Sequence, residues 1–215
     1  MTKNTHALKD QQEQIFITIS EMLGAISSPV RLRLIHFLSQ GPQTVEVLAH
    51  KIEQSLANTS MHLRKMLSAQ IVEVRTKGKN RVYSLQPAVF SFWETCQDFS
   101  LAINPSLELK VDEDINWKED LKTTVKLLKE KSFVLIDARP LDESSEDISE
   151  LDVLRFDPTN LQKEIAKFNK KKSALVFCRG RLCVLSSHIV HELRKNGIKA
   201  YRLNQSWYSL KRSLS

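Results

Sequence analysis

The spacing of apolar residues changes about halfway along the chain, and this change limits the folds that the chain can adopt. In the first half, apolar residues recur every three or four positions over 15–24 and 30–39, as in amphipathic helices. Within that half, residues 71–85 alternate like a β-hairpin. In the second half, the short apolar runs FVLID, VLRF, ALVF and KAYRL are interspersed with helical patterns, which is typical of a parallel sheet.

Two domains follow from this change. The segment 105–116 contains a proline and the acidic run VDEDIN, and we interpret it as a linker. We therefore predict a mainly α-helical domain over 1–104 and an α/β domain with a small, mainly parallel sheet over 117–215.

Composition narrows the class of protein. With 41% hydrophobic and 27% charged residues, the chain of 215 residues is expected to be globular, with neither a membrane span nor a signal peptide. Three cysteines do not form a disulfide framework, which favours the cytoplasm. The net charge of +7 makes an anionic partner attractive.

The order of elements in the first domain is that of a winged helix-turn-helix. Ser28 is positioned to cap the helix over 30–39, a short helix follows at 44–51, and Ser55 can cap a fourth helix. We expect that fourth helix to bury the side chains of Leu56, Ser60, Leu63 and Leu67. The hairpin over 71–85 would be the wing, with the sequence KGKN at its tip.

Basic residues gather on the fourth helix and the wing, which predicts contact with duplex DNA. Between residues 64 and 81 lie six basic residues and one acid. The residues that we expect to face base edges are Ser55, Asn58, Thr59, Met61 and His62. Phosphate contacts are expected from Arg64, Lys65, Lys77, Lys79 and Arg81. The alternative is a solvated helix face beside an ordinary hairpin.

The segments LGAISSPVRLRLIHFL, TVEVLAHKI and SLANTSMHLRKMLSAQIVEVRTKGKNRVYSL, in this order, resemble the ArsR family of dimeric bacterial repressors over residues 15–103. The resemblance implies a homodimer that reads a pseudo-palindromic operator. It also implies dimerisation through the first and last helices, which carry Ile15, Phe16, Ile19, Phe90, Trp93 and Phe99. The third helix lacks the cysteine pair of metal-sensing members, and neither a metal site nor a cofactor is expected.

The loop CRGRLC is the second site that the sequence indicates. Cys178 ends the strand ALVF and Cys183 precedes a helix, so backbone N–H groups and the helix dipole should lower the pKa of a thiol at Cys178. Arg179 and Arg181 add positive charge. Two alternatives remain: buried cysteines that only pack, and half of a metal site with His188 and His191 of the following helix.

The runs FVLIDARPLDE and ALVFCRGRLCVLSSHIVHELRKNGIKAYRL, with Trp207 near the end, resemble a rhodanese domain over about 117–213. The resemblance implies that Cys178 carries sulfane sulfur as a persulfide, and that Asp137 and Arg139 have a structural role. It implies a cradle for the sulfur formed by the backbone of Arg179, Gly180, Arg181, Leu182 and Cys183. The family's G-H-I-P-G-A segment is replaced by SSEDISELDV, and its glycine near the terminal tryptophan is missing.

The CRGRLC loop also resembles that of the subgroup in which a rhodanese follows an ArsR-type repressor. A second thiol at Cys183 could attack a persulfide on Cys178 and leave a disulfide. The sequence thus predicts a cytoplasmic, dimeric transcriptional regulator that senses or transfers sulfur from a small donor. The alternatives are a sulfurtransferase with an accessory DNA-binding domain, and a regulator with an inactive rhodanese scaffold. Cys96 on the last helix of the first domain is expected to pack.

Overall fold

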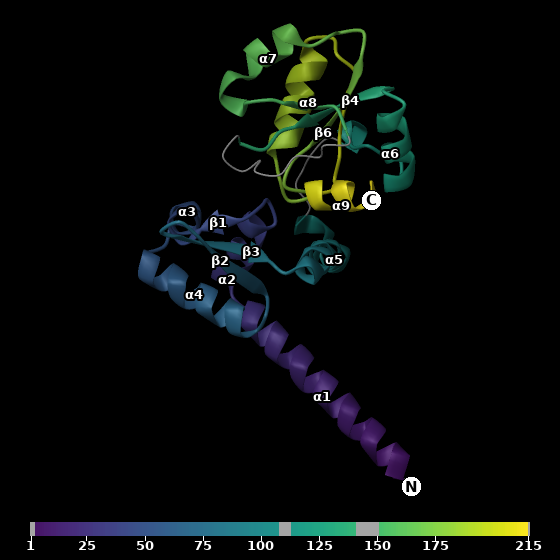
Figure 1. The fold of residues 1–215 in the computed structure, drawn as a ribbon. Coiled ribbons are helices and arrows are strands. Elements are labelled where there is room, and N and C mark those ends of the chain that lie inside the picture. Colours follow the sequence, from purple (N-terminus) through teal and green to yellow (C-terminus); the bar gives the residue numbers. More distant parts are fainter. Residues whose placement is uncertain (1–2, 108–112, 141–150, 215) are drawn as a thin grey trace. The chain divides into compact units, whose positions relative to one another are not determined.

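The computed structural model describes residues 3–107, 113–140 and 151–214 (Figure 1). The chain divides into two compact units, Met1–Phe90 and Ser91–Ser215. Residues 144–150 of the segment SSEDISELDV lie outside the described residues. No single helix among the described residues has the length and apolar character to cross a membrane, and α1 and α2 meet that criterion only as a pair bent by 90°.

The first helix is longer than predicted. It runs over Lys3–Ile26 as α1, whereas the apolar spacing indicated a start at Ile15. The added turns are polar and rich in Ala, Leu, Lys, Gln and Glu, which favour helix without any apolar face to mark it. Large apolar side chains remain exposed on α1 at Leu8, Ile15, Phe16, Ile17, Ile19 and Leu23.

The next three helices agree with the sequence prediction. They are α2 (Pro29–Leu38), α3 (Val45–Lys51) and α4 (Leu56–Ser68). Thr44 caps α3 and Ser55 caps α4, and in each case the side-chain oxygen accepts a hydrogen bond from a backbone N–H in the first turn.

The wing is the predicted hairpin with one additional strand. Its arms are β2 (Val72–Lys77) and β3 (Asn80–Leu85), paired antiparallel, and the two-residue strand β1 (Gln43–Thr44) completes a sheet in the order β1-β3-β2. Gly78 has φ of 62° at the first of the two turn residues, as tight hairpin turns with a primed geometry require. The helices and the wing confirm a winged helix-turn-helix.

Helix α5 (Pro87–Ile103) begins two residues after β3 and spans the division between the two units. After α5, the segment predicted as a linker contains two short 3-10 helices, Pro105–Leu107 and Glu113–Ile115. The predicted domain limits themselves stay a prediction.

The second unit contains a four-stranded parallel sheet, as predicted. Its strands are β4 (Phe133–Asp137), β5 (Val153–Arg155), β6 (Ser173–Phe177) and β7 (Ala200–Arg202), in the order β5-β4-β6-β7. All pairings are parallel, with Leu135 opposite Leu175 at the centre of the sheet. The fold class predicted from the sequence is confirmed.

Helices cover both faces of this sheet (Figure 1). One face packs Ile136 and Val176 against α7 (Leu161–Lys167) and α8 (Leu185–Lys195) in a core cluster that includes Cys178 and Cys183. On the other side lie α6 (Leu121–Lys129) and α9 (Trp207–Arg212), and α9 is a helix that the sequence pattern did not indicate.

Candidate DNA-contact surface and dithiol site

The exposed face of α4 differs from the predicted one by about one residue of rotation. The buried residues are Thr59, Leu63 and Met66, whereas Leu56 is 52% exposed. The prediction that Thr59 faces bases is therefore wrong: its side chain is fully buried and its hydroxyl donates to the Ser55 carbonyl oxygen at 2.9 Å. The error arose because Leu56 is apolar and Thr59 polar, while a capped first turn points Leu56 outward.

The other predicted base-facing residues have distinct environments. Ser55 uses its hydroxyl to accept from the N–H of Asn58 at 3.2 Å, and the Asn58 side-chain amide donates to Gln54 Oε1 at 2.6 Å. Met61 is 57% exposed and Leu56 is 52% exposed, so α4 presents two apolar side chains to solvent. Leu56 was missed in the sequence because its apolar character assigned it to the core.

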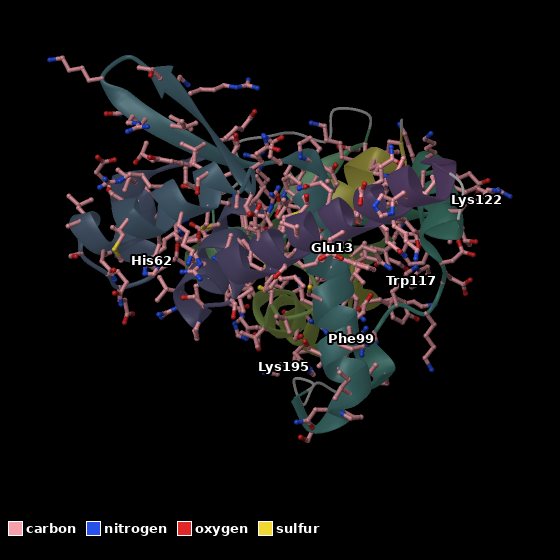
Figure 2. The ribbon with its side chains drawn as sticks, turned by 90° about the horizontal axis from the view of Figure 1, so that it is seen from below. Glu13, His62, Phe99, Trp117, Lys122 and Lys195 are labelled. Atoms are coloured by element: carbon pink, nitrogen blue, oxygen red, sulfur yellow. The ribbon has the colours of Figure 1, made fainter. Side chains whose placement is uncertain are left out.

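His62 lies on α4 (Figure 2), and its ring is close to the buried side chain of Arg31. Its Nδ1 is 3.4 Å from Nη1 of Arg31, which can only donate, so the ring proton belongs on Nε2. Partial burial, together with the positive charges of Arg31 and Lys65, lowers the pKa of His62. The imidazole is therefore neutral near pH 7, with an N–H available as a donor.

The five predicted phosphate-binding side chains are all exposed. Two lie on α4 and three on the hairpin arms and tip: Arg64, Lys65, Lys77, Lys79 and Arg81. Arg75, on β2, is also exposed but pairs with Glu73 at 3.1 Å. The basic side chains at the wing tip are thus exposed to solvent, and few acidic residues lie near them in the sequence.

The residues predicted at a dimer interface include several with large exposed surfaces. Ile15, Phe16 and Ile19 on α1 are each about half exposed, and Phe99 on α5 is 65% exposed (Figure 2). Phe90 and Trp93 are partly buried.

Cys178 and Cys183 come together at the end of β6 and the start of α8. Their Sγ atoms lie 2.6 Å apart, both cysteines are free thiols, and they are 0% and 4% exposed. Among the described residues, no three His, Cys, Asp or Glu side chains cluster as metal ligands would, and His188 and His191 do not join the thiols.

The two thiols share one ionisation, and it falls on Cys183. The hydrogen bond from Cys178, the backbone N–H groups of Arg179 and Leu185, and the charge of Arg179 lower the pKa of Cys183 to about 6 despite its burial. The same hydrogen bond and burial raise the pKa of Cys178. The prediction of a lowered pKa at Cys178 is therefore wrong, because the backbone N–H groups of Arg179 and Leu185 favour the thiolate on Cys183.

The loop between the cysteines is a tight turn built around Gly180. Gly180 has φ of 89°, which a residue with a side chain rarely adopts, and its carbonyl accepts from the N–H of Cys183 at 3.2 Å. That N–H is thus already used within the predicted cradle. Leu182 is exposed and Arg179 is partly exposed.

A buried arginine stabilises this loop by donating hydrogen bonds to its backbone carbonyl oxygens. Arg202, on β7, is 3% exposed and its Nη2 donates to the carbonyl oxygens of Arg181 at 2.7 Å and Cys183 at 3.2 Å. Its Nε donates to Ser186 Oγ at 3.2 Å on α8. The sequence analysis missed Arg202, because an arginine in a strand-like run KAYRL carries no signal that its side chain is buried.

Asp137 and Arg139 form a buried ion pair at the end of β4. Arg139 Nη2 is 2.7 Å from Asp137 Oδ2, Nε donates to both carboxylate oxygens, and both side chains are almost inaccessible. The guanidinium lies 5.5 Å from the ring centre of Phe177 and 5.6 Å from that of Trp207. The pair joins β4, β6 and α9, which supports the structural role that the resemblance implied.

The dithiol loop and α9 both contact α5 within the second unit. Arg181 Nη1 is 2.8 Å from Asp98 Oδ1. Ser206 and Ser209, at the start of α9, donate to Glu94 carboxylate oxygens at 2.5 to 2.8 Å. Arg212 Nη1 donates to Ser91 Oγ at 2.9 Å.

Comparison with known proteins agrees with this architecture. Residues 26–75 match a family model described as a helix-turn-helix domain. The chain is 22% identical over 202 residues to the HTH-type transcriptional regulator Rv0324 of Mycobacterium tuberculosis, covering 91% of this chain and 88% of that protein. This similarity extends over both units.

Solved structures similar to the chain cover less than half of it. One is the homodimeric winged helix-turn-helix DNA-binding domain of Mb0332 from Mycobacterium bovis, a possible ArsR-family regulator (23% identity, 46% of this chain, 87% of that chain, TM-score 0.39). Another is the transcriptional repressor BigR of Xylella fastidiosa (24% identity, 42% and 94%, TM-score 0.38). The ArsR-type identity of the first unit and the rhodanese-like identity of the second stay predictions, whereas the family match and the fold identify residues 26–75 as a helix-turn-helix domain within a winged helix.

Proposed function

We propose that this protein is a dimeric, cytoplasmic, DNA-binding transcriptional regulator whose affinity for its operator is set by reaction of Cys178 and Cys183 with sulfane sulfur. The observation that carries the proposal is the pair of buried free thiols at 2.6 Å on the same chain as a winged helix-turn-helix. The similarity to a transcriptional regulator over 91% of the chain supports it.

In the proposed complex, α4 enters the major groove and the wing lies along the phosphate backbone. Met61 and Leu56 offer apolar contact for thymine methyl groups, and Asn58 offers an amide for base edges once it exchanges its bond to Gln54. The neutral His62 adds an N–H donor. The exposed cations of α4 and the wing bind phosphates without sequence preference.

A second copy of the chain is the proposed partner of α1. Its exposed apolar side chains Leu8, Ile15, Phe16, Ile19 and Leu23 recur at spacings of three, four and seven, so they form one stripe along the helix. A two-fold dimer would place two α4 helices on the half-sites of a pseudo-palindromic operator.

The proposed chemistry begins at Cys183, because it holds the thiolate. The thiolate attacks the terminal sulfur of a persulfide donor R–S–SH, forming an S–S bond and releasing R–S⁻, which takes the proton of Cys178. Cys178 then attacks the Cys183 sulfur of the new persulfide, forming the disulfide and releasing HS⁻. The two thiols lose two electrons, and the sulfane sulfur is reduced to sulfide. This reverses the roles that the resemblance assigned to the two cysteines.

The short distance between the two sulfur atoms favours disulfide formation over a long-lived persulfide on Cys183. The sulfur atoms need to approach by only about half an ångström to reach disulfide bonding distance. A resolving thiol this close discharges a persulfide before it can be passed to an acceptor, which favours a regulator over the alternative sulfurtransferase.

The experiment is an operator titration with intact-mass analysis. The protein is titrated against its own upstream DNA by fluorescence anisotropy, reduced and after glutathione persulfide. We expect a loss of about 2 Da and a change in Kd of about fivefold or more. Cys178→Ser should stop at a gain of about 32 Da, while Cys183→Ser should gain nothing; Cys96→Ser is the matched control and should respond as the wild type.

The outcomes separate the alternatives. Multiple turnover of sulfur from thiosulfate to cyanide, lost in the cysteine variants, would favour the sulfurtransferase. Wild-type protein that gains neither a persulfide nor a disulfide would leave the second unit as an inactive scaffold.

A further inference from the structure

One face of α5 binds the dithiol loop and the segment that supports it. Asp98 forms an ion pair with Arg181 of the loop. Glu94, one turn earlier on the helix, accepts hydrogen bonds from the hydroxyl groups of Ser206 and Ser209. Ser91 and Asp98 flank Glu94 at spacings of three and four, so all three lie on one face of the helix.

The connection between Glu94 and Ser206 also involves the dithiol loop, because Gly180 of that loop packs against Ser206. A Cβ placed on Gly180 would lie 3.9 Å from Cβ of Ser206 and 3.8 Å from the carbonyl oxygen of Asn204, so the turn packs directly on the residue that binds Glu94. Ser206 is buried and caps α9. Two paths therefore join the loop to α5, one through Arg181 and one through Gly180 and Ser206.

Disulfide formation would alter the loop from which both connections to α5 start. Arg181 lies inside the ring that a Cys178–Cys183 disulfide closes, and the reaction removes the negative charge that the N–H groups of Arg179 and Leu185 stabilise in the reduced form. Because the sulfur atoms need to move only slightly, we expect this loss of charge, rather than a large movement, to shift the loop, while Arg202 still holds the Arg181 carbonyl. Contacts made by Arg181 and Gly180 are the ones that respond.

We infer that α5 is the element that reports the state of the dithiol to the DNA-binding part of the chain, through Asp98 on Arg181 and Glu94 on Ser206 and Ser209. The inference rests on the proposed function and names the residues by which the sulfur state is transmitted. α5 starts two residues after the wing strand β3, so a change in its position acts directly on the base of the wing. A ligand changes an equilibrium only through contacts that differ between states, and on this inference the contacts of Asp98 and Glu94 are the ones that differ.

The exposed ion pair alone is too weak for this role. Arg181 and Asp98 side chains are 36% and 65% exposed, where water screens the attraction. The partly buried Glu94 bonds are better shielded, and a test must therefore remove both.

The test compares wild type with Glu94→Gln/Asp98→Asn, and uses Glu192→Gln as a matched control, because Glu192 pairs with Lys195 on the exposed surface of α8. Operator Kd is measured before and after glutathione persulfide. We expect the double variant to form the disulfide and to bind DNA normally when reduced, but to change Kd by less than about twofold where the wild type and the control change about fivefold or more.

A double variant that responds as the wild type does would overturn the inference. So would a loss of DNA affinity in its reduced form, because Glu94 and Asp98 would then serve DNA binding itself. If the wild type fails to respond, the proposed function fails, and a second measurement decides the inference alone. Arg181→Ala/Ser206→Ala/Ser209→Ala, which removes both connections, should raise hydrogen exchange in the peptide covering 91–103 without any sulfur donor, and exchange equal to wild type would refute the connection.

Discussion

The Sγ atoms of Cys178 and Cys183 lie 2.6 Å apart at the N-terminus of α8, where the pKa of Cys183 is lowered and that of Cys178 is raised. Backbone N–H groups from the loop and from the first residue of α8 converge on Cys183. The reactivity of this site is therefore set by the pair.

The first prediction concerns pH. Because the pKa of Cys183 is lowered to about 6, the rate of its reaction with iodoacetamide should rise between pH 5 and 7 and then level off. Thiolate absorbance near ~240 nm should rise over the same range. Cys178→Ala removes the donor and should shift the curve to higher pH, while Cys178→Ser keeps an O–H donor and should shift it less. A single transition near pH 9 in the wild type would contradict this assignment.

Burial raises the pKa of Cys96, so the reaction of Cys96 with iodoacetamide should appear only at the alkaline end of the titration.

The second prediction concerns Arg202. Arg202→Met would leave the carbonyl oxygens of Arg181 and Cys183 buried without this donor, at a cost of about 1–3 kcal/mol for each. Urea unfolding should therefore show a loss of about 2 kcal/mol or more, and the thiolate titration should move to higher pH as the loop relaxes. Arg155→Met, at an exposed position on β5, is the control. Stability and thiolate titration equal to wild type would rule out this role.

The third prediction concerns the buried pair Asp137 and Arg139. Removing one partner leaves an uncompensated buried charge, so Asp137→Asn or Arg139→Met should each destabilise the protein by about 3–5 kcal/mol. The double variant should be more stable than the sum of the two losses predicts, because neither charge is left alone. Additive losses in urea unfolding would show that the two side chains act independently.

The fourth prediction concerns DNA. Arg64→Ala and Lys79→Ala should weaken binding to all sequences and each reduce the slope of log K against log salt by about one. Lys122→Ala, at a cation on α6 (Figure 2), should change neither quantity. Met61→Ala and Asn58→Ala should instead relax the sequence preference at an unchanged salt slope. Salt slopes that stay at the wild-type value in both cation variants would exclude this docking.

The fifth prediction concerns the dimer. Ile15→Glu/Ile19→Glu places two charges in the exposed apolar stripe of α1 and should yield monomers in sedimentation velocity experiments. Gln14→Glu lies on the opposite side of α1 and should leave the association state unchanged. A wild-type protein that sediments as a monomer at all concentrations would exclude the proposed partner of α1.

Periodicity predicted most of the fold because each core stripe repeats along its own element. The four strands of the parallel sheet, the cap Ser55 and the wing were all visible as local patterns, whereas Ser28 precedes α2 without a capping hydrogen bond from its side chain. The early start of α1 was not, since its first turns carry no apolar stripe. The rotation of α4 was missed because one polar side chain, Thr59, satisfies its hydroxyl on the backbone of its own helix and can therefore be buried.

The dithiol site was found from spacing, but its electrostatics depend on tertiary contacts. The two cysteines and the glycine between them were evident in CRGRLC. Which thiol ionises depends on where the N-terminus of α8 points, and the loop depends on Arg202, which is contributed by a strand 19 residues after Cys183. Neither the identity of the ionised thiol nor the support of the loop by Arg202 can be predicted from a local sequence pattern.

Helix α5 has a mechanical property that follows from its composition. Between residues 88 and 103 it contains neither glycine nor proline, the two residues at which helices most often kink. Asp98 lies eleven residues from Pro87, or about 16 Å along the axis. A displacement of Asp98 would therefore meet neither a glycine nor a proline before it reached Pro87, the residue at which the helix begins.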